Sequence, residues 1–510
     1  MADAEPGPEK YSINEMMDRL KQSNDPSPED GVLVTREDGT QAIRVRKRKR
    51  RSEQPAKERA KRKKRVRAIQ ITAGLSLGVL GLLAAGGALV YTNTSSYRTR
   101  LLGKLNEATG SHAEVSQYRV TPTSADALEL DLQWPETSPL KQLSMRSVEA
   151  DLHAKSFFGG GWSGEEVLAQ TAELKIGTPH EASSSIQATP AEPFFRFERI
   201  RSPKASILIG DSANPSVAVR DCEISFYPKN TSGRPELRLN RGTVSFGKDF
   251  PAFPLDRSLL IFNGNQLDLV ALRLSAPDHP QGTLQFSGSI SATGEPRPAT
   301  MDVKFTSFPL EHLAGRDLGR FLSGPADSRE AATVNFLTFV PGQTDSYRFA
   351  ASWTGGGDSP LKMAELPCFS ELARLIGDGW FIAPAFDGAC GGTLRLEKAN
   401  VRFDDLDLHA KSRLRITGSI SVGKDKALSG HLRLGLPSSF ALADESGRLD
   451  QLLSAENEGF RWVDVEVSGT AAKPVDDFRQ KLAGALTTPR KPAANKAESE
   501  SQFEELTRPR

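Results

Sequence analysis

Three short patterns in this chain have the residue types and spacing of a serine nucleophile. Gly161-Trp162-Ser163-Gly164 begins a Gly-x-Ser-x-Gly pattern, but Glu165 stands where the last Gly is required. Ser138–Lys141 and Ser359–Lys362 both read Ser-Pro-Leu-Lys, which is Ser-x-x-Lys spacing, and in each the Pro favours a turn or a helix start. The seven His are scattered, and neither a Cys-x-x-Cys pair nor a phosphate-binding Gly loop is present. We therefore expect no catalytic residues, no metal and no cofactor.

The three cysteines leave two interpretations open. Cys222, Cys368 and Cys390 are too few for a disulfide framework. Cys368 and Cys390 could pair in an oxidising compartment, with Cys222 as a buried apolar side chain. Alternatively, all three are simply buried.

A long uncharged segment predicts a membrane anchor. Residues 68–97 contain no Lys, Arg, Asp or Glu, and Ile69–Tyr91 is long enough to cross a bilayer as a helix. Before it, 15 basic residues lie between Arg44 and Arg67, which places the N-terminus in the cytoplasm by the positive-inside rule. A cleaved signal peptide is the competing interpretation, but the charged leader and the apolar run are both too long for one. We expect a single-pass protein of the inner (cytoplasmic) membrane, with the bulk of the chain extracytoplasmic, in the periplasm.

Charge and composition divide the rest of the chain. Residues 1–67 are polar and basic, and we expect a disordered cytoplasmic arm that contacts anionic lipid. Within the arm, Ile13–Leu20 has the spacing of a short amphipathic helix that could dock a cytoplasmic partner. Beyond residue 67 there are 47 basic and 52 acidic side chains, a balance that argues against nucleic acid as a partner. Residues 487–510 are expected to form a disordered tail.

Between the arm and the tail, apolar residues alternate with polar ones at period two. The run from Leu414 through Ile416 and Ile420 to Val422 is followed by a second run, Leu428–Leu436, which predicts a hairpin. Each strand would have one apolar and one polar face, as in antiparallel sheets with one solvated side. The sequence thus predicts a mainly β fold. Its apolar face would be formed by positions that include Leu267, Leu269, Leu284, Phe286, Ile290, Met301, Val303, Phe305, Leu414, Ile416 and Ile420.

Helices and repeats are the weaker signals. Helices are predicted at Leu310–Leu322, Leu361–Ile376, Phe440–Leu453 and Val475–Leu486. Asp-Leu-His-Ala-Lys-Ser occurs at Asp151–Ser156 and again at Asp407–Ser412, and Gly-Ser-Ile-Ser occurs at 288–291 and 418–421. These echoes favour duplicated β units, with 98–325 and 326–486 as the candidate units.

The order of these elements resembles the AsmA-like proteins of bacterial envelopes, relatives of TamB and of the bridge-like lipid-transfer proteins. The similar parts are a link ending in Thr109-Gly110, strands at His112–Val120 and Leu128–Trp134, and a closing segment. That segment runs from Phe460–Val467 through Ser468-Gly469-Thr470 and Pro474 to the predicted helix at Val475–Leu486. Pro309–Leu313 and Leu394–Leu436 resemble a linking helix and the C-terminal region of the family. The long basic arm departs from its usual short N-terminus.

The resemblance implies an elongated, curled β-sheet with an apolar concave face that forms a lipid groove and supports envelope biogenesis. It implies no catalytic residues. Membrane lipids and envelope proteins would be the partners, and the apolar positions given above would line the groove. Two functions remain in competition: a β-groove that binds or conducts phospholipid, and a bitopic scaffold or assembly factor whose apolar face is a filled core.

Overall fold

We analysed a computed structural model of the chain. The structure describes residues 31–35, 37–39, 41–45, 76, 79–80, 83–84, 86–157, 161–177, 193–211, 213–264, 266–291, 298–329, 335–340, 346–398, 400–443, 447–454 and 456–487. It forms two compact units, Met1–Ala84 and Ala85–Arg510. In the first unit, β1 (Gly31–Thr35) and β2 (Gln41–Val45) form an antiparallel hairpin, where the sequence suggested only a disordered arm. Asp38-Gly39 lies at its turn, and Gly39 has the positive φ that such turns require.

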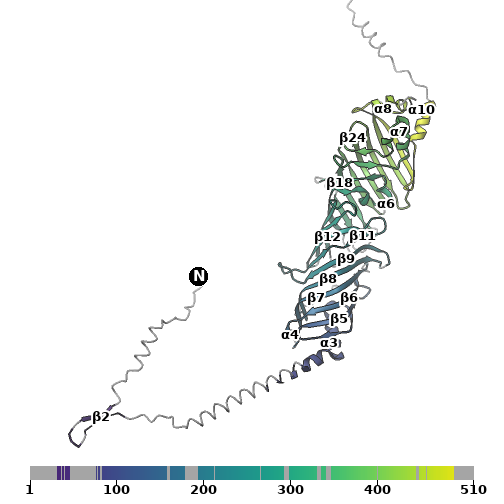
Figure 1. Cartoon of the computed structure of the whole chain (residues 1–510). Coiled ribbons are helices and arrows are strands. Elements are labelled where there is room, and N and C mark those ends of the chain that lie inside the picture. The colour runs from purple at the N-terminus through teal and green to yellow at the C-terminus, as the bar shows by residue number, and fades with distance from the viewer. Residues whose placement is uncertain are drawn as a thin grey trace, which may run out of the picture. The chain divides into compact units, whose positions relative to one another are not determined.

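The second unit is one large curled sheet, and the prediction of a mainly β fold is confirmed (Figure 1). Its first strands are β3 (His112–Ser116), β4 (Arg119–Val120), β5 (Ser124–Gln133), β6 (Leu140–Asp151), β7 (Trp162–Ile176), β8 (Phe195–Gly210) and β9 (Pro215–Tyr227). The middle strands are β10 (Glu236–Asn240), β11 (Thr243–Phe246), β12 (Phe253–Asn263), β13 (Gln266–Ser275), β14 (Thr283–Ser291), β15 (Ala299–Thr306), β16 (Phe308–Pro309), β18 (Pro325–Ser328), β19 (Phe336–Phe339) and β20 (Arg348–Gly355). The last are β23 (Cys390–Glu397), β24 (Asn400–Ala410), β25 (Leu414–Val422), β26 (Leu428–Pro437), β27 (Phe460–Thr470) and β28 (Lys473–Asp476).

The ladder differs from the prediction in one pairing. Neighbouring strands pair antiparallel, but β7 and β8 are parallel, so the sheet is mixed rather than antiparallel throughout. Parallel neighbours need a crossover instead of a hairpin turn. Here the crossover is residues 177–194, most of which lie outside the described part of the chain. The predicted hairpin of β25 and β26 is confirmed, with Ile416 paired to Leu434.

The helices differ from those predicted. After residue 92, the helices of the described residues are α3 (Ser95–Thr109), α4 (Ala154–Phe157), α5 (Leu310–Leu313), α6 (Gly315–Leu318), α7 (Pro367–Ile376), the 3₁₀ helix η2 (Gly379–Ile382), α8 (Ser438–Ala443), α9 (Arg448–Leu452) and α10 (Phe478–Thr487). A small second sheet contains β17 (Leu322–Ser323), β21 (Leu361–Met363) and β22 (Ala385–Phe386).

Each of the four predicted helices is therefore corrected at its boundaries. The helix expected at Leu310–Leu322 is split into α5 and α6 at Gly315, the first residue of α6, because its φ of +74° interrupts a continuous helix. The predicted segment ends in β17. Leu361–Ile376 begins as β21 and becomes helical only at Pro367. Phe440–Leu453 is two helices, α8 and α9, and Val475 belongs to β28 because Pro474 pairs with Gly469 in the sheet.

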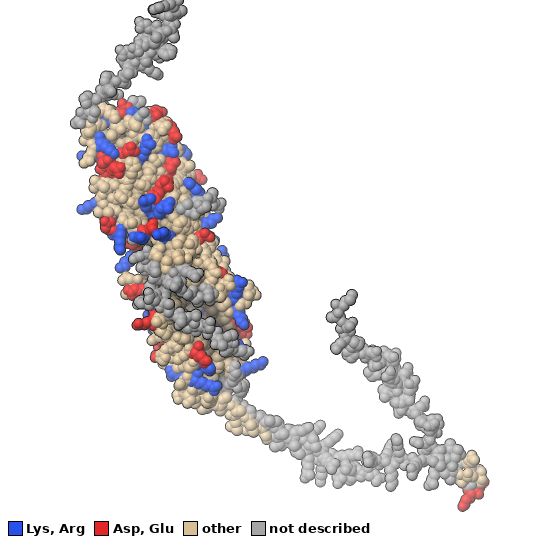
Figure 2. Space-filling view, turned by 180° about the vertical axis from the view of Figure 1, so that it is seen from behind, with Lys and Arg blue, Asp and Glu red and all other residues tan. Residues whose placement is uncertain are grey.

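The hydrophobic core is continuous from β8 to α10. Helices α5, α6, α7, α9 and α10, with η2, pack against the apolar side of the C-terminal strands, and we call them the helical layer. The largest side chains with less than 2% exposure, such as Trp353, Phe369 and Phe403, lie between Leu274 and Phe478. The core and the sheet continue across the predicted unit boundary at residues 325–326. On the surface, basic and acidic side chains are intermixed (Figure 2).

Candidate functional site

One apolar row crosses nearly the whole sheet on a single face. Directly paired residues of neighbouring strands point to the same side, so a chain of such pairs traces one face. The row begins at Val120 on β4 and ends at Leu428 on β26. Its members are Val120, Ala125, Ala150, Val167, Ile200, Phe226, Leu237, Leu260, Leu269, Gly288, Met301, Leu337, Phe349, Leu396, Val401, Val422 and Leu428. No member is polar, and we call this the paired apolar row.

The row is partly exposed along most of its length. From Val167 to Leu260 its side chains are of intermediate exposure, whereas Val422 and Leu428 at the far end are buried. Beside the row, apolar side chains of β7, β8 and β9 are also only partly covered: Ala172, Leu174, Ile176, Ile209 and Val217. These five residues, together with Val167 and Ile200, form what we call the open apolar face.

Most of the residues predicted to line a groove are packed core. Nine of them are buried, at 6% exposure or less, in the main hydrophobic cluster: Leu269, Leu284, Phe286, Met301, Val303, Phe305, Leu414, Ile416 and Ile420. Leu267 and Ile290 pair with each other at one end of β13 and β14 and stay half-exposed. Two of the eleven, Leu269 and Met301, belong to the paired apolar row.

Sequence reasoning missed the open apolar face, although its strands alternate as clearly as the others. Leu174 and Ile176 on β7 and Ile207 and Ile209 on β8 repeat at period two, which was the available signal. The sequence does not show which of the alternating strands are covered by helices.

The helical layer is tied to the sheet by polar contacts as well as by packing. Asp476 at the end of β28 accepts hydrogen bonds from the backbone N–H groups of Cys368 (2.6 Å) and Phe478 (3.2 Å), which join the N-termini of α7 and α10. Burial raises the pKa of the Asp476 carboxyl above its ordinary value, and these two N–H donors oppose that shift. Arg320, two residues after α6, donates a hydrogen bond to the carbonyl oxygen of Ala471 at 3.1 Å. These contacts make the helical layer an integral part of the fold.

The disulfide suggested for Cys368 and Cys390 does not form in the structure. All three cysteines are free and buried, as in the second interpretation of the sequence. Cys368 lies at the start of α7, while the Cys390 sulfur, on β23, accepts a hydrogen bond from the backbone N–H of His409 at 3.4 Å. Burial raises the pKa of the Cys222 thiol to about 11 and also raises the pKa of the other two thiols. Each thiol is thus protonated and unreactive at neutral pH.

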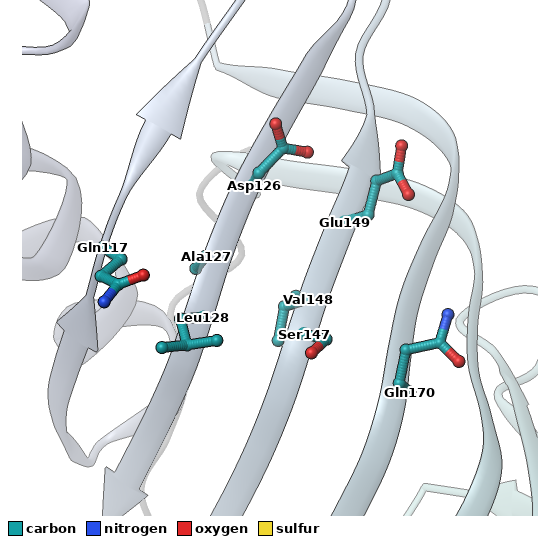
Figure 3. A pocket seen from close by; sticks show the side chains of 8 residues that line it. All are labelled: Gln117, Asp126, Ala127, Leu128, Ser147, Val148, Glu149 and Gln170. Atoms are coloured by element: carbon teal, nitrogen blue, oxygen red, sulfur yellow. The ribbon is translucent and has the colours of Figure 1, made fainter.

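A shallow hollow of about 350 Å³ lies across β5 to β7 (Figure 3). Asp126 and Glu149, directly paired, lie at one side of it, and Leu128, 44% exposed, lies at another. Ser147, at φ +50°, interrupts the pairing of β5 with β6 at this point, and the alternation changes phase there. The hollow holds no cluster of catalytic groups, and it marks an irregularity of the sheet.

The serine patterns bring no catalytic partners together. Ser163 Oγ lies 3.0 Å from Ser156 Oγ, and the described hydrogen bonds of the Ser163 hydroxyl include no His, Lys or Asp side chain. Over the described ranges, no group of three His, Cys, Asp or Glu is placed to hold a metal ion.

The predicted anchor lies largely outside the described residues. Among the helices that are described, none is both long enough and apolar enough to cross a bilayer. Residues 86–91 are helical, and there Leu89, Val90 and Tyr91 are 41%, 68% and 49% exposed. The predicted helix at Ile13–Leu20 and the tail beyond Thr487 are also outside the described residues.

Comparison with known proteins adds no relative. No family model, no curated protein and no solved structure matches the chain. The resemblance to the AsmA-like family therefore stays a prediction.

Proposed function

We propose that this chain is a single-pass membrane protein of the cell envelope that binds lipid acyl chains on the open apolar face. The observation that carries the proposal is the paired apolar row, because it joins the half-exposed strands at one end of the sheet into one apolar surface. In this proposal residues 1–67 are cytoplasmic, Ile69–Tyr91 spans the membrane, and the sheet is extracytoplasmic.

The dimensions of the open apolar face suit a single acyl chain. Strands β7 to β9 at about 4.8 Å spacing extend roughly 10 Å across this face, and Val167 to Ile176 extends roughly 30 Å along β7 at about 3.3 Å per residue. Half of a bilayer's hydrocarbon core is about 15 Å. Burial of apolar area alone would hold the chain, at about 0.8 kcal/mol for each CH₂ removed from water, so no headgroup site is required. The buried strands under the helical layer take no part in this binding.

A matched pair of variants tests this proposal. Ile209 pairs with Ile176 and Val217 and packs beside the main core, whereas its neighbour Leu208 pairs with Lys175 and Ala218 on the opposite face. Both side chains are of intermediate exposure. The full-length protein, Ile209→Asp and Leu208→Asp are purified in mild detergent, and phospholipid that co-purifies is measured by mass spectrometry.

We expect lipid with the wild type and with Leu208→Asp, and severalfold less with Ile209→Asp at an unchanged unfolding temperature. Equal lipid in both variants, or none in the wild type, would contradict the proposal.

The second candidate is a scaffold or assembly factor, and the helical layer favours it. A sheet whose apolar side is filled by its own helices offers outer surfaces for protein contacts and no room for lipid. If the wild type carries no lipid but retains envelope proteins through a detergent wash, the scaffold is the better account.

A further inference from the structure

Aromatic side chains from four segments cluster at the end of the sheet that its first strands form. They lie beside α3, the helix that begins where the uncharged segment at residues 68–97 ends. Trp162 Nε1 donates to the Tyr97 hydroxyl at 3.1 Å, and its ring stacks on Tyr118 at a centroid distance of 6.5 Å. Tyr91 meets Tyr97 edge-on at 5.4 Å. The members of this group, which we call the aromatic collar, are Tyr91, Tyr97, Tyr118, Trp162, Phe194, Phe195 and Phe197.

The helix and the collar form one rigid joint. The Asn93 side chain makes both backbone hydrogen bonds of Val120 that a paired strand would make. Its Oδ1 accepts from the N–H of Val120 and its Nδ2 donates to the Val120 carbonyl, both at 2.8 Å. On α3, Asn106 Oδ1 accepts from the N–H of Ala113 on β3 at 2.8 Å. Trp134 Nε1 donates to the Thr109 carbonyl at 2.9 Å. The direction of the helix therefore fixes the direction of the sheet.

The chemistry of the collar is that of a membrane–water interface. Tyr and Trp concentrate where a span meets the headgroups, because each ring has an apolar body and a polar tip. The Tyr118 hydroxyl is buried and has no hydrogen-bond partner, and burial raises the pKa of Tyr118. Only Trp162 of the collar is buried, and the other six rings are partly exposed or exposed.

Basic residues lie next to the collar rings along the chain. Arg98 follows Tyr97, Arg119 follows Tyr118, and Arg196 lies between Phe195 and Phe197. The nearby acids in the chain and the ladder include Asp126, which pairs with Arg119, Glu149, which pairs with Asp126, and Glu165 and Glu198. An arginine close to a membrane surface attracts anionic lipid headgroups, and each one contributes about 1 kcal/mol of binding free energy.

We infer that the aromatic collar is a seat on the headgroup layer of an anionic phospholipid bilayer, so that the first strands of the sheet touch the membrane surface. This inference rests on the membrane anchor of the proposed function. The occupant is the bilayer that the uncharged segment enters, since Leu89 and Val90 are exposed apolar residues immediately before Tyr91, the first ring of the collar.

The repeated hexapeptide supplies a matched pair of probe positions. Lys155 and Lys411 occupy the same place in Asp-Leu-His-Ala-Lys-Ser, and both are exposed. Lys155 is on α4, whose Ser156 hydroxyl accepts from the N–H of Ser163, next to Trp162. Lys411 follows β24, in the C-terminal part of the sheet. The three native cysteines are buried, so a fluorophore would label only an introduced one.

Full-length Lys155→Cys and Lys411→Cys, each labelled with bimane, are reconstituted in vesicles of phosphatidylcholine and phosphatidylglycerol. Flotation of the protein with the vesicles tests the anchor by itself. Headgroup spin-labelled lipid should then quench the label at 155 severalfold more than the label at 411. Vesicles of phosphatidylcholine alone should reduce the difference, because the arginines lose their anionic partners.

Flotation with equal quenching at both positions would contradict the proposal that the collar contacts headgroups, but it would not contradict the membrane anchor. Failure to float would overturn the anchor and the collar together. A labelled Tyr118→Ala protein adds a second readout: we expect it to float as before but to lose most of the quenching at 155.

Discussion

Strands β5 to β8 and strands β23 to β27 alternate apolar and polar residues in the same way, yet their apolar sides are covered to very different extents. In the first group, Leu174 and Ile209 are half-exposed, whereas in the second Phe403, Ile416 and Leu434 have no measurable exposure. The difference comes from the helical layer, which covers the C-terminal strands and extends to β12, where His312 on α5 meets Phe253. Amphipathic strands thus need a cover, and this chain supplies its own cover at one end.

The comparison also separates stability from function. Packed interiors lose several kcal/mol when a large side chain is cut back, because a cavity remains. Half-exposed apolar side chains contribute less to folding and are available to bind another molecule. The C-terminal part is therefore expected to hold the fold together, and the first strands are expected to hold the ligand.

The largest effect should be the loss of a core ring. Phe403→Ala removes a fully buried ring that meets Trp353 edge-on, and we expect the free energy of unfolding to fall by about 3–5 kcal/mol. Leu174→Ala on the open apolar face should cost less, about 1–2 kcal/mol, since that side chain is only partly buried. Urea unfolding followed by tryptophan fluorescence measures both. Similar losses for the two variants would remove the distinction between the parts.

The next effect concerns the attachment of the helical layer. Asp476→Ala leaves the backbone N–H groups of Cys368 and Phe478 without their acceptor, and we expect a cost of about 1–3 kcal/mol. The loss should appear in the unfolding of the C-terminal part, and lipid bound by the first strands should be unchanged.

Asp476 also makes a prediction about pH. Its pKa in the folded protein is raised above the ordinary 3.8, so the folded protein holds this proton more tightly than the unfolded chain. Stability from this group is therefore fully present below pH 3.8 and is lost as the pH rises through the folded pKa. The wild type should lose stability relative to Asp476→Asn as the pH rises from about 3.8 toward neutral. A constant difference across that range would show that the carboxyl is not buried as described.

The smallest effect is kinetic and compares two thiols. Cys222 lies on β9, near the open apolar face, whereas Cys368 lies in the helical layer, at the start of α7. In urea below the main transition, we expect a thiol reagent to reach Cys222 first, because fewer buried contacts resist local opening there. Labelling followed by peptide mass spectrometry gives the order, and simultaneous labelling of both thiols would mean that the sheet opens as one cooperative unit.

Local alternation predicted strands well wherever a hairpin turn joins them. The hairpin of β25 and β26 is an example, since its pairing depends only on neighbours in the chain. The parallel pairing of β7 and β8 depends on a long crossover, which carries no local signal. The predicted helix ends were wrong where backbone conformation overrides apolar spacing. One example is Gly315, whose positive φ separates α5 from α6.

The candidate site was harder to predict, because the tertiary structure decides which apolar strand faces are covered by helices. Alternation shows that Leu284 and Leu174 each lie on an apolar face, but not that one is 3% exposed and the other half-exposed. The paired apolar row depends on the register of every strand, which no single segment specifies. The sequence could therefore predict an apolar face, and only the tertiary structure separates its open part from its filled part.

Photo-crosslinking with a lipid that carries a diazirine in its acyl chain tests the central claim most directly. The full-length protein is reconstituted with the lipid, irradiated and digested, and the modified peptides are mapped by mass spectrometry. We predict crosslinks on the open apolar face, at Leu174, Ile176, Ile209 or Val217, and none at Phe403, Ile416 or Leu434. Crosslinks confined to the C-terminal strands, or no crosslinks anywhere on the sheet, would contradict the account.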